Sequence, residues 1–241
     1  MSSTDNIKNK STGPKLMVTV LLAGLLTLAG TPASAALVTS RALLGGTDFI
    51  DWGNLGSDYD QQSSPVQVAS NLGVNATVSN PNGELWTLVE GGANSGYTGN
   101  FALGDGLLST FLTPGPIIID FTSGQSRVGA QIQSIAYLGF TGVISVYDVS
   151  NGLLESYTLS GNSNGSQDNT AIFLGVSRAT ADILRVVFDI TGSADDGAGF
   201  AINQVDLSSS GAPPVPLPAA AWLLLSGLGG LGLLRRRRTA G

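Results

Sequence analysis

The sequence predicts an all-β fold: an antiparallel, jelly-roll-like β-sandwich in residues 36–207, flanked by an N-terminal signal helix and a C-terminal transmembrane sorting helix. Short runs rich in Val, Ile, Leu, Phe and Thr recur between clusters of Gly, Asn, Asp and Ser, which is the pattern of strands joined by turns. This middle segment contains no convincing amphipathic helix. Many short strands with regular turn signals favour a sandwich over a parallel sheet.

The strongest local signal in the segment is the pair Asn151-Gly152, which separates two β-favouring runs. Asn and Gly both tolerate a positive φ angle, so the pair predicts a β-hairpin. In chain order, the expected strands are Phe49–Trp52, Ala76–Ser79, Leu85–Glu90, Leu107–Leu112, Ile117–Phe121, Gly129–Ile135, Gly142–Val149, Leu153–Leu159, Ala171–Val176, Leu184–Ile190 and Phe200–Leu207.

Charge is distributed unevenly along the chain. The formal net charge is −6, but residues 36–218 carry four arginines against sixteen acidic residues, which gives this stretch a net charge of −12. Such an acidic domain repels phosphate backbones, and we therefore expect no nucleic-acid partner. The chain has no Cys and no His, which removes thiol catalysis and the usual general base.

The first 35 residues are typical of a signal peptide. Three lysines precede an apolar run over residues 16–29, and Ala33 and Ala35 provide the small-x-small pattern of a cleavage site before Ala36. An uncleaved membrane anchor is the alternative, but the run is shorter than the ~20 residues that a spanning helix prefers. We therefore expect signal peptidase to release a mature chain that begins at Ala36.

The last 34 residues combine a linker, an apolar segment and a basic end. Residues 208–214 are a Ser-, Gly- and Pro-containing linker, and residues 219–234 are uncharged and close to the lower limit for spanning a bilayer. Four arginines follow and are expected to stop transfer and keep that end in the cytoplasm. These residues are Arg235, Arg236, Arg237 and Arg238.

This C-terminal arrangement resembles the PEP-CTERM sorting signal over residues 215–238. The motif residues are Val215, Pro216, Leu217, Pro218 and Ala219, similar to a recognised variant of the common Val-Pro-Glu-Pro form. The resemblance implies an exported protein of a Gram-negative bacterium, held briefly in the inner membrane and processed by an exosortase-type membrane peptidase. It also implies delivery to the cell surface or extracellular matrix, in association with exopolysaccharide and biofilm. A plain tail anchor is the alternative.

One segment matches a catalytic signature. Residues 161–165 fit the G-x-S-x-G pattern of α/β-hydrolases, but that chemistry needs a base beside the serine, normally His. We therefore interpret the segment as a loop. A hydrolase that uses paired carboxylates is a third-ranked alternative.

Calcium is the one candidate cofactor, because the domain offers carboxylate, amide and carbonyl oxygens and no softer ligands. Candidate metal ligands are paired acidic residues in two expected loops: Asp58 with Asp60, and Asp195 with Asp196. Among the aromatic residues available for stacking on sugars are Trp52, Trp86, Tyr59 and Tyr97. We expect an exported, non-enzymatic β-sandwich of unassigned ligand; the alternative is a carbohydrate-binding module, with calcium dependence as an option.

Overall fold

The computed structural model describes residues 36–111, 113–193, 197 and 199–209. The signal segment before Ala36 and the sorting motif, apolar segment and arginines after Val215 lie outside the described residues, as do Ala33, Ala35, Asp195 and Asp196. Within the described part of the chain, no helix has the length and apolar character needed to cross a membrane.

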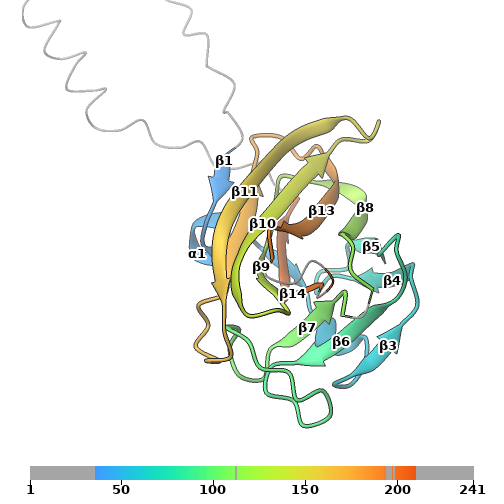
Figure 1. The fold of residues 1–241 in the computed structure, drawn as a ribbon. Coiled ribbons are helices and arrows are strands. Elements are labelled where there is room, and N and C mark those ends of the chain that lie inside the picture. The colour runs from blue at the N-terminus through green and yellow to red at the C-terminus, as the bar shows by residue number, and fades with distance from the viewer. Residues whose placement is uncertain (1–35, 112, 194–196, 198, 210–241) are drawn as a thin grey trace, which may run out of the picture. The chain divides into compact units, whose positions relative to one another are not determined.

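The described residues form two antiparallel sheets (Figure 1). The nine-stranded sheet has the order β1 (Ala36–Val38), β12 (Ile172–Ser177), β9 (Arg127–Ser134), β14 (Phe200–Ile202), β7 (Gly106–Ser109), β6 (Leu85–Val89) and β3 (Asp60–Gln62), while β15 (Val205–Ser208) pairs with β9 and with β2 (Asp48–Ile50). The six-stranded sheet has the order β11 (Leu153–Ser163), β10 (Leu138–Tyr147), β13 (Ile183–Thr191), β8 (Ile117–Gln125), β5 (Asn75–Ser79) and β4 (Val66–Ala69). The prediction of an all-β, antiparallel structure is confirmed, and jelly-roll connectivity stays a prediction.

The main core lies between the two sheets. Ile132 of β9 and Ile202 of β14 come from the larger sheet, Ile144 of β10 and Phe188 of β13 from the smaller one, and all four belong to one buried cluster. The strand pairings and this core lie within residues 36–208. This segment therefore contains the partners that its strands need, and it folds as one unit.

A second, smaller core covers the opposite face of the larger sheet. Leu107 and Leu108 are adjacent on β7 and so point to opposite faces. Leu108 joins the main core, whereas Leu107 packs with Leu88 and with Phe101 of the β6–β7 connection. Loops thus cover part of this outer face, and the functional site described below lies on the same side.

The hairpin predicted at Asn151-Gly152 is confirmed. Strands β10 and β11 pair from Leu138 to Tyr147, and Asn151 adopts a φ of 62° in the turn. The Asp148 side chain accepts hydrogen bonds from the backbone N–H groups of Ser150 and Gly152, both at 2.8 Å, which fixes the turn from inside.

The single strand predicted over Phe200–Leu207 is wrong, because Asn203 and Gln204 interrupt it to give β14 and β15. The register against β9 shifts by one residue between the two strands. Asn203 explains the shift: its Oδ1 accepts from Gln131 N at 3.1 Å and its Nδ2 donates to Gln131 Oε1 at 2.6 Å. The extra residue acts as a β-bulge and directs the Asn203 side-chain amide toward Gln131 of β9. β15 ends at Ser208, the first residue of the expected linker.

Three short strands, β1, β3 and β4, and two helical turns escaped prediction. The turn α1 (Arg41–Leu44) is a one-turn helix that begins after Ser40, whose Oγ accepts from Leu43 N at 3.3 Å, and ends at Gly45 with φ 59°. The 3₁₀ turn η1 (Trp52–Asn54) follows β2. Both turns position residues of the candidate site.

Candidate binding groove

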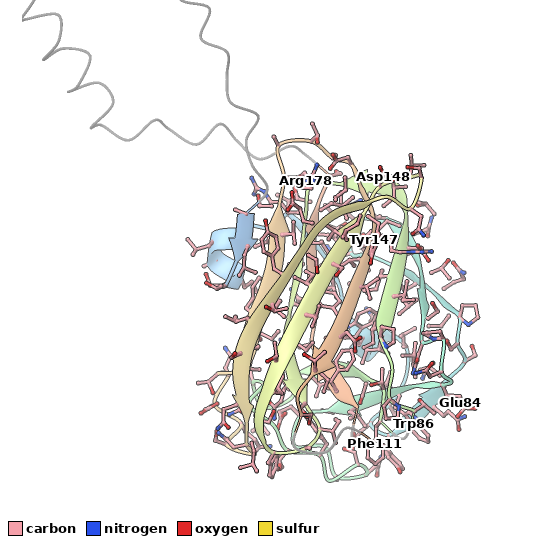
Figure 2. The ribbon with its side chains drawn as sticks, turned by 45° about the horizontal axis from the view of Figure 1, so that its top comes forward. Glu84, Trp86, Phe111, Tyr147, Asp148 and Arg178 are labelled. Carbon is pink, nitrogen blue, oxygen red and sulfur yellow. The ribbon has the colours of Figure 1, made fainter. Side chains whose placement is uncertain are left out.

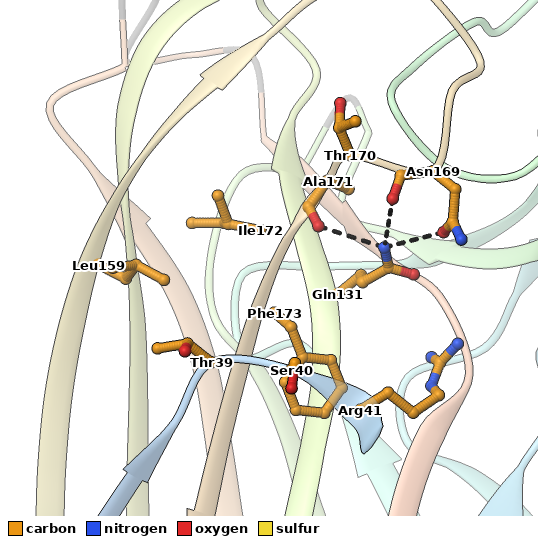
Figure 3. A pocket seen from close by; sticks show the side chains of 10 residues that line it. All are labelled: Thr39, Ser40, Arg41, Gln131, Leu159, Asn169, Thr170, Ala171, Ile172 and Phe173. Carbon is orange, nitrogen blue, oxygen red and sulfur yellow. Dashed lines mark hydrogen bonds between the residues drawn. The ribbon is translucent and has the colours of Figure 1, made fainter. Parts of the chain in front are cut away.

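Two hollows meet at the side chain of Arg41 and together form what we call the Arg41 groove. The larger has a volume of about 440 Å³ and is shown in Figure 3. The smaller has a volume of about 340 Å³. The larger hollow is lined by Thr39, Ser40, Arg41, Gln131, Leu159, Asn169, Thr170, Ala171, Ile172 and Phe173. The smaller is lined by Arg41, Asp51, Gly53, Gly56, Val89, Gly104, Asp105, Gly106, Asn203 and Gln204.

Arg41 is held in a fixed orientation at the junction. Its Nε lies 2.5 Å from Asp206 Oδ2, and its Nη2 donates to Asn203 Oδ1 at 3.1 Å and to Gln204 O at 3.3 Å. The guanidinium carbon lies 5.9 Å from the centre of the Phe173 ring. The Arg41 side chain is 40% exposed, so the ion pair adds little stability, but its partners aim the guanidinium at both hollows.

Side-chain amides form the floor of the groove. Gln131 of β9 donates through Nε2 to Asn169 Oδ1 at 3.0 Å and to Ala171 O at 3.2 Å (Figure 3). On the other side, Asn203 links Gln131 to Asp105 through a 3.1 Å bond from Nδ2 to Oδ2. Gln131 and Asn203 are buried, whereas Asn169 and Thr170 are exposed at the rim. The two buried amides use their N–H groups within the protein and thereby order the floor, whereas Asn169 and Thr170 remain accessible to a ligand at the rim.

Asn100 braces the segment that carries the rim. Its Nδ2 lies 2.9 Å from Asn164 Oδ1 and 3.2 Å from Thr170 Oγ1, and its backbone O accepts from Ala171 N at 3.0 Å. The Nδ2 also contacts Ser166 Oγ at 3.0 Å and Asp168 Oδ1 at 3.2 Å. Hydrogen bonds from Thr170, Ser166 and Asn100 lower the pKa of Asp168 to about 2. The side-chain amide of Asn100 thus holds every second residue of the loop between positions 164 and 170.

Carboxylates outnumber cationic groups around the smaller hollow, whereas the lining of the larger one contains Arg41 and no acidic residue. Arg41 is the one cationic side chain in the two linings, and it already pairs with Asp206. Asp51 and Asp105 add two more carboxylates to the smaller hollow. Together with the net charge of −12 over residues 36–218, this favours an uncharged ligand over an anionic one.

The predicted metal ligands Asp58 and Asp60 occupy different hydrogen-bond networks. Asp58 accepts from the backbone N–H groups of Val89, Asn94 and Ser95, each at 2.9 Å, whereas Asp60 accepts from Ser57 N at 2.7 Å. Burial raises the pKa of Asp58, but these hydrogen bonds outweigh it and lower the pKa overall. Among the described residues, no three acidic side chains gather as a metal site would require. Calcium binding stays a prediction.

The G-x-S-x-G segment is not the loop that the sequence predicted. Strand β11 continues through Ser163, so the first three residues of the motif belong to the sheet. Ser163 is only 2% exposed. Its hydroxyl is therefore out of reach of a substrate, which agrees with the rejection of a hydrolase nucleophile.

The aromatic candidates separate into core and surface. Trp52 is fully buried and donates through Nε1 to Asn203 O at 2.8 Å, so it supports the groove from beneath. Tyr59 and Trp86 lie together, with ring centres 5.0 Å apart.

Sequence reasoning did not predict Arg41, Gln131 or Asn203 as site residues. The one available signal for this site was that Gln131 and Gln133 alternate with apolar residues along a central strand. Buried amides need hydrogen-bond partners, so these two glutamines indicate a polar network on the outer face of the sheet.

No protein-family model and no curated protein matches the chain. Among solved structures, a DUF4465 family protein from Bacteroides caccae is similar, with 11% identity over 73% of this chain and 100% of that one, at a TM-score of 0.37. A CsCBM6-3 structure from Clostridium stercorarium in complex with cellobiose has 11% identity over 64% and 98%, at a TM-score of 0.31. A glycoside hydrolase family 43 arabinoxylan arabinofuranohydrolase from Bacillus subtilis has 14% identity over 52% and 25%, at 0.29. Structural similarities with such low sequence identities and TM-scores do not indicate which ligand this chain binds.

Proposed function

We propose that residues 36–207 form a non-catalytic carbohydrate-binding domain whose Arg41 groove takes a segment of a neutral polysaccharide. The observation that carries this proposal is the ordered floor of amides at the junction of two open hollows. Adjacent sugar hydroxyls each donate and accept a hydrogen bond. Asn169 and Thr170 present such groups at the exposed rim, and the buried amides of Gln131 and Asn203 hold the floor beneath them in place. Their positions are set before any ligand arrives, which lowers the entropic cost of binding.

The size and charge of the groove support the same ligand class. The larger hollow alone lies within the range of roughly 300–1,000 Å³ common for small-ligand sites. The surplus of carboxylates disfavours uronic acids and phosphorylated polymers. Leu159 and Ile172 are only partly buried and add apolar surface to the lining of the larger hollow, against which the C–H groups of a sugar can pack.

We further propose that this domain acts outside the cytoplasm. The signal segment, the Val215–Ala219 motif and the four terminal arginines support export, transient anchoring in the inner membrane and processing by an exosortase-type peptidase. A polysaccharide-binding domain released at the cell surface would meet its ligand in the extracellular matrix.

Affinity electrophoresis of residues 36–209 in gels with dextran, hydroxyethylcellulose, galactomannan or polygalacturonate tests the binding proposal. We expect at least one neutral polymer to retard the protein and polygalacturonate to leave it unaffected. Asn169→Gly should weaken the retardation by about three- to tenfold, because it removes amide hydrogen bonds without straining the backbone.

Asn151→Gly is the matched control, since Asn151 and Asn169 both adopt positive φ, at 62° and 60°, and Asn151 lies at the β10–β11 turn. Retardation by polygalacturonate alone, or none by any polymer, contradicts the proposal. Parallel gels with calcium and with a chelator test the predicted calcium dependence.

A further inference from the structure

We propose that Tyr59, packed on Trp86, is a second saccharide contact: an aromatic platform that takes a pyranose ring by its apolar face. This inference rests on the proposed function and extends it to a separate surface. Figure 2 labels Trp86 and Phe111 at the end of the sandwich opposite the hairpin residue Asp148.

Three rings form the platform. Tyr59 lies with its ring centre 5.0 Å from that of Trp86 at an interplanar angle of 33°, and 6.2 Å from that of Phe111 at 54°. Tyr59 remains 41% exposed, whereas Trp86 and Phe111 are half-buried beneath and beside it. The two supporting rings fix the orientation of the exposed one, so little side-chain entropy is lost when a ligand stacks on it.

The backbone of Tyr59 is held in an uncommon conformation. Its φ is 70°, a region that a bulky residue enters only when the surrounding structure imposes it. The neighbours on both sides impose it here. Asp58 accepts the three backbone N–H bonds described above, Asp60 accepts from Ser57 N, and Tyr59 N donates to Thr87 O at 2.8 Å. Asp58 and Asp60, which the sequence predicted to bind calcium, thus hold Tyr59 in place from both sides.

A small, mainly apolar hollow lies beside the platform. It has a volume of about 70 Å³ and is lined by Tyr59, Tyr97, Phe111, Leu88, Ser95 and Ile135. The Tyr97 hydroxyl itself is buried close to Gly99 and Glu90, and burial raises its pKa. The hollow therefore adds apolar surface next to Tyr59, against which the C–H groups of a sugar can pack.

The platform and the Arg41 groove share one connecting segment. Residues 51–60 contribute Asp51, Gly53 and Gly56 to the smaller hollow and carry Tyr59 at their far end. Two contacts on one domain raise the apparent affinity for a polymer, since the second binding event becomes intramolecular. Asp58 and Asp60 flank the platform and disfavour an anionic partner there, as the carboxylates do in the groove.

Tyr59→Gly is the decisive variant, because glycine accepts the positive φ angle while the whole tyrosine side chain is removed. Tyr59→Phe keeps the ring and loses the hydroxyl. We expect the melting temperature of residues 36–209 to change by less than about 5 °C in either variant. Affinity for the neutral polymer that retards the wild type should fall by at least about fivefold in Tyr59→Gly and stay within twofold in Tyr59→Phe.

Tryptophan fluorescence separates the platform from the groove. Residues 36–209 contain two tryptophans, Trp52 in the core and Trp86 in the platform. The same polymer should change the emission of the wild type and of Asn169→Gly, and should leave that of Tyr59→Gly and Trp86→Phe unchanged.

The outcomes distinguish the two proposals. Binding by Tyr59→Gly within twofold of the wild type, or an unchanged Trp86 emission during retardation, overturns the platform and leaves the groove standing. Binding by Asn169→Gly at the wild-type level, together with a loss in Tyr59→Gly, overturns the groove and supports the platform. A wild type that neither binds nor responds to any neutral polymer contradicts both.

Discussion

Arg41 and Glu90 illustrate how single residues govern the outer face of the larger sheet. Arg41 is partly exposed and pairs with Asp206, whereas Glu90, the residue that follows β6, is 1% exposed. Glu90 Oε1 accepts from Gly99 N at 2.7 Å. Burial, with a smaller contribution from the charge of Asp105, raises the pKa of Glu90, although hydrogen bonds from Gly99 and Gln167 oppose the shift.

A raised pKa has a definite consequence for stability. The folded state then binds the Glu90 proton more tightly than the unfolded state does. The folded form is therefore favoured at acidic pH and loses this contribution as the pH rises through the raised pKa. We expect Glu90→Gln to melt a few degrees higher than the wild type at pH 7, because it buries no charge and keeps the acceptor for Gly99.

Thermal unfolding of both proteins between pH 3 and pH 8 checks this prediction. The difference between them should vanish toward pH 3, where Glu90 is protonated in either state. A Glu90→Gln variant less stable than the wild type at pH 7 would show that the carboxylate is stabilising.

At the scale of elements, the β10–β11 hairpin is set by its own turn residues. Asn151 has φ 62°, and its Oδ1 accepts from Arg185 Nη1 at 2.7 Å. Asn151→Val removes that bond and forces a β-branched residue into positive φ, whereas Asn151→Gly removes the bond alone. We expect urea denaturation to show the Val variant less stable than the Gly variant by about 1–3 kcal/mol. Equal stabilities would mean that the turn changes conformation at no cost.

Local signals account for the elements that the sequence predicted well. Asn151-Gly152 marks its hairpin in the local sequence, and the long runs of β8 and β13 carry enough β-branched residues to be recognised. By contrast, β1 and β3 have three residues each and exist because a partner strand lies beside them. The break between β14 and β15 depends on Gln131, more than 70 residues away in sequence.

The candidate site was the part least accessible to prediction. Sequence reasoning named Tyr59 and Trp86 among four aromatic residues available for stacking, but not as a pair. The calcium role that it gave Asp58 and Asp60 stays a prediction, and their separate hydrogen-bond networks had no signal in the sequence. The Arg41 groove joins α1, β9, β12, the loop that Asn100 braces and the bulge at Asn203. No local pattern unites residues so far apart along the chain.

At the scale of the whole molecule, the acidic domain and the basic ends have different roles. The net charge of −12 over residues 36–218 favours solubility and disfavours anionic polymers, while all three lysines and four of the eight arginines lie beyond this stretch at the two ends.

Intact mass spectrometry of the exported protein from its native cells tests the delivery proposal. We expect a mature chain that begins at Ala36 and ends near the Val215–Ala219 motif, without the apolar segment that follows it. Replacement of Arg235–Arg238 by neutral residues should leave the protein mis-sorted. Recovery of residues 1–15 would refute cleavage of the signal, and retention of residues 223–234 would favour a simple membrane anchor.

The central claim is that ordered side-chain amides of the Arg41 groove bind a neutral polysaccharide. Its most direct test is a titration of ¹⁵N-labelled residues 36–209 with short fragments of the neutral polymer that retards the protein, followed by NMR. The account predicts the largest side-chain amide shift at the exposed Asn169, smaller shifts at Gln131 and Asn203, which are linked to it by hydrogen bonds, and no shift at Gln67 of β4. Shifts confined to residues outside the groove and the Tyr59 platform, or no shifts at saturating fragment, would contradict it.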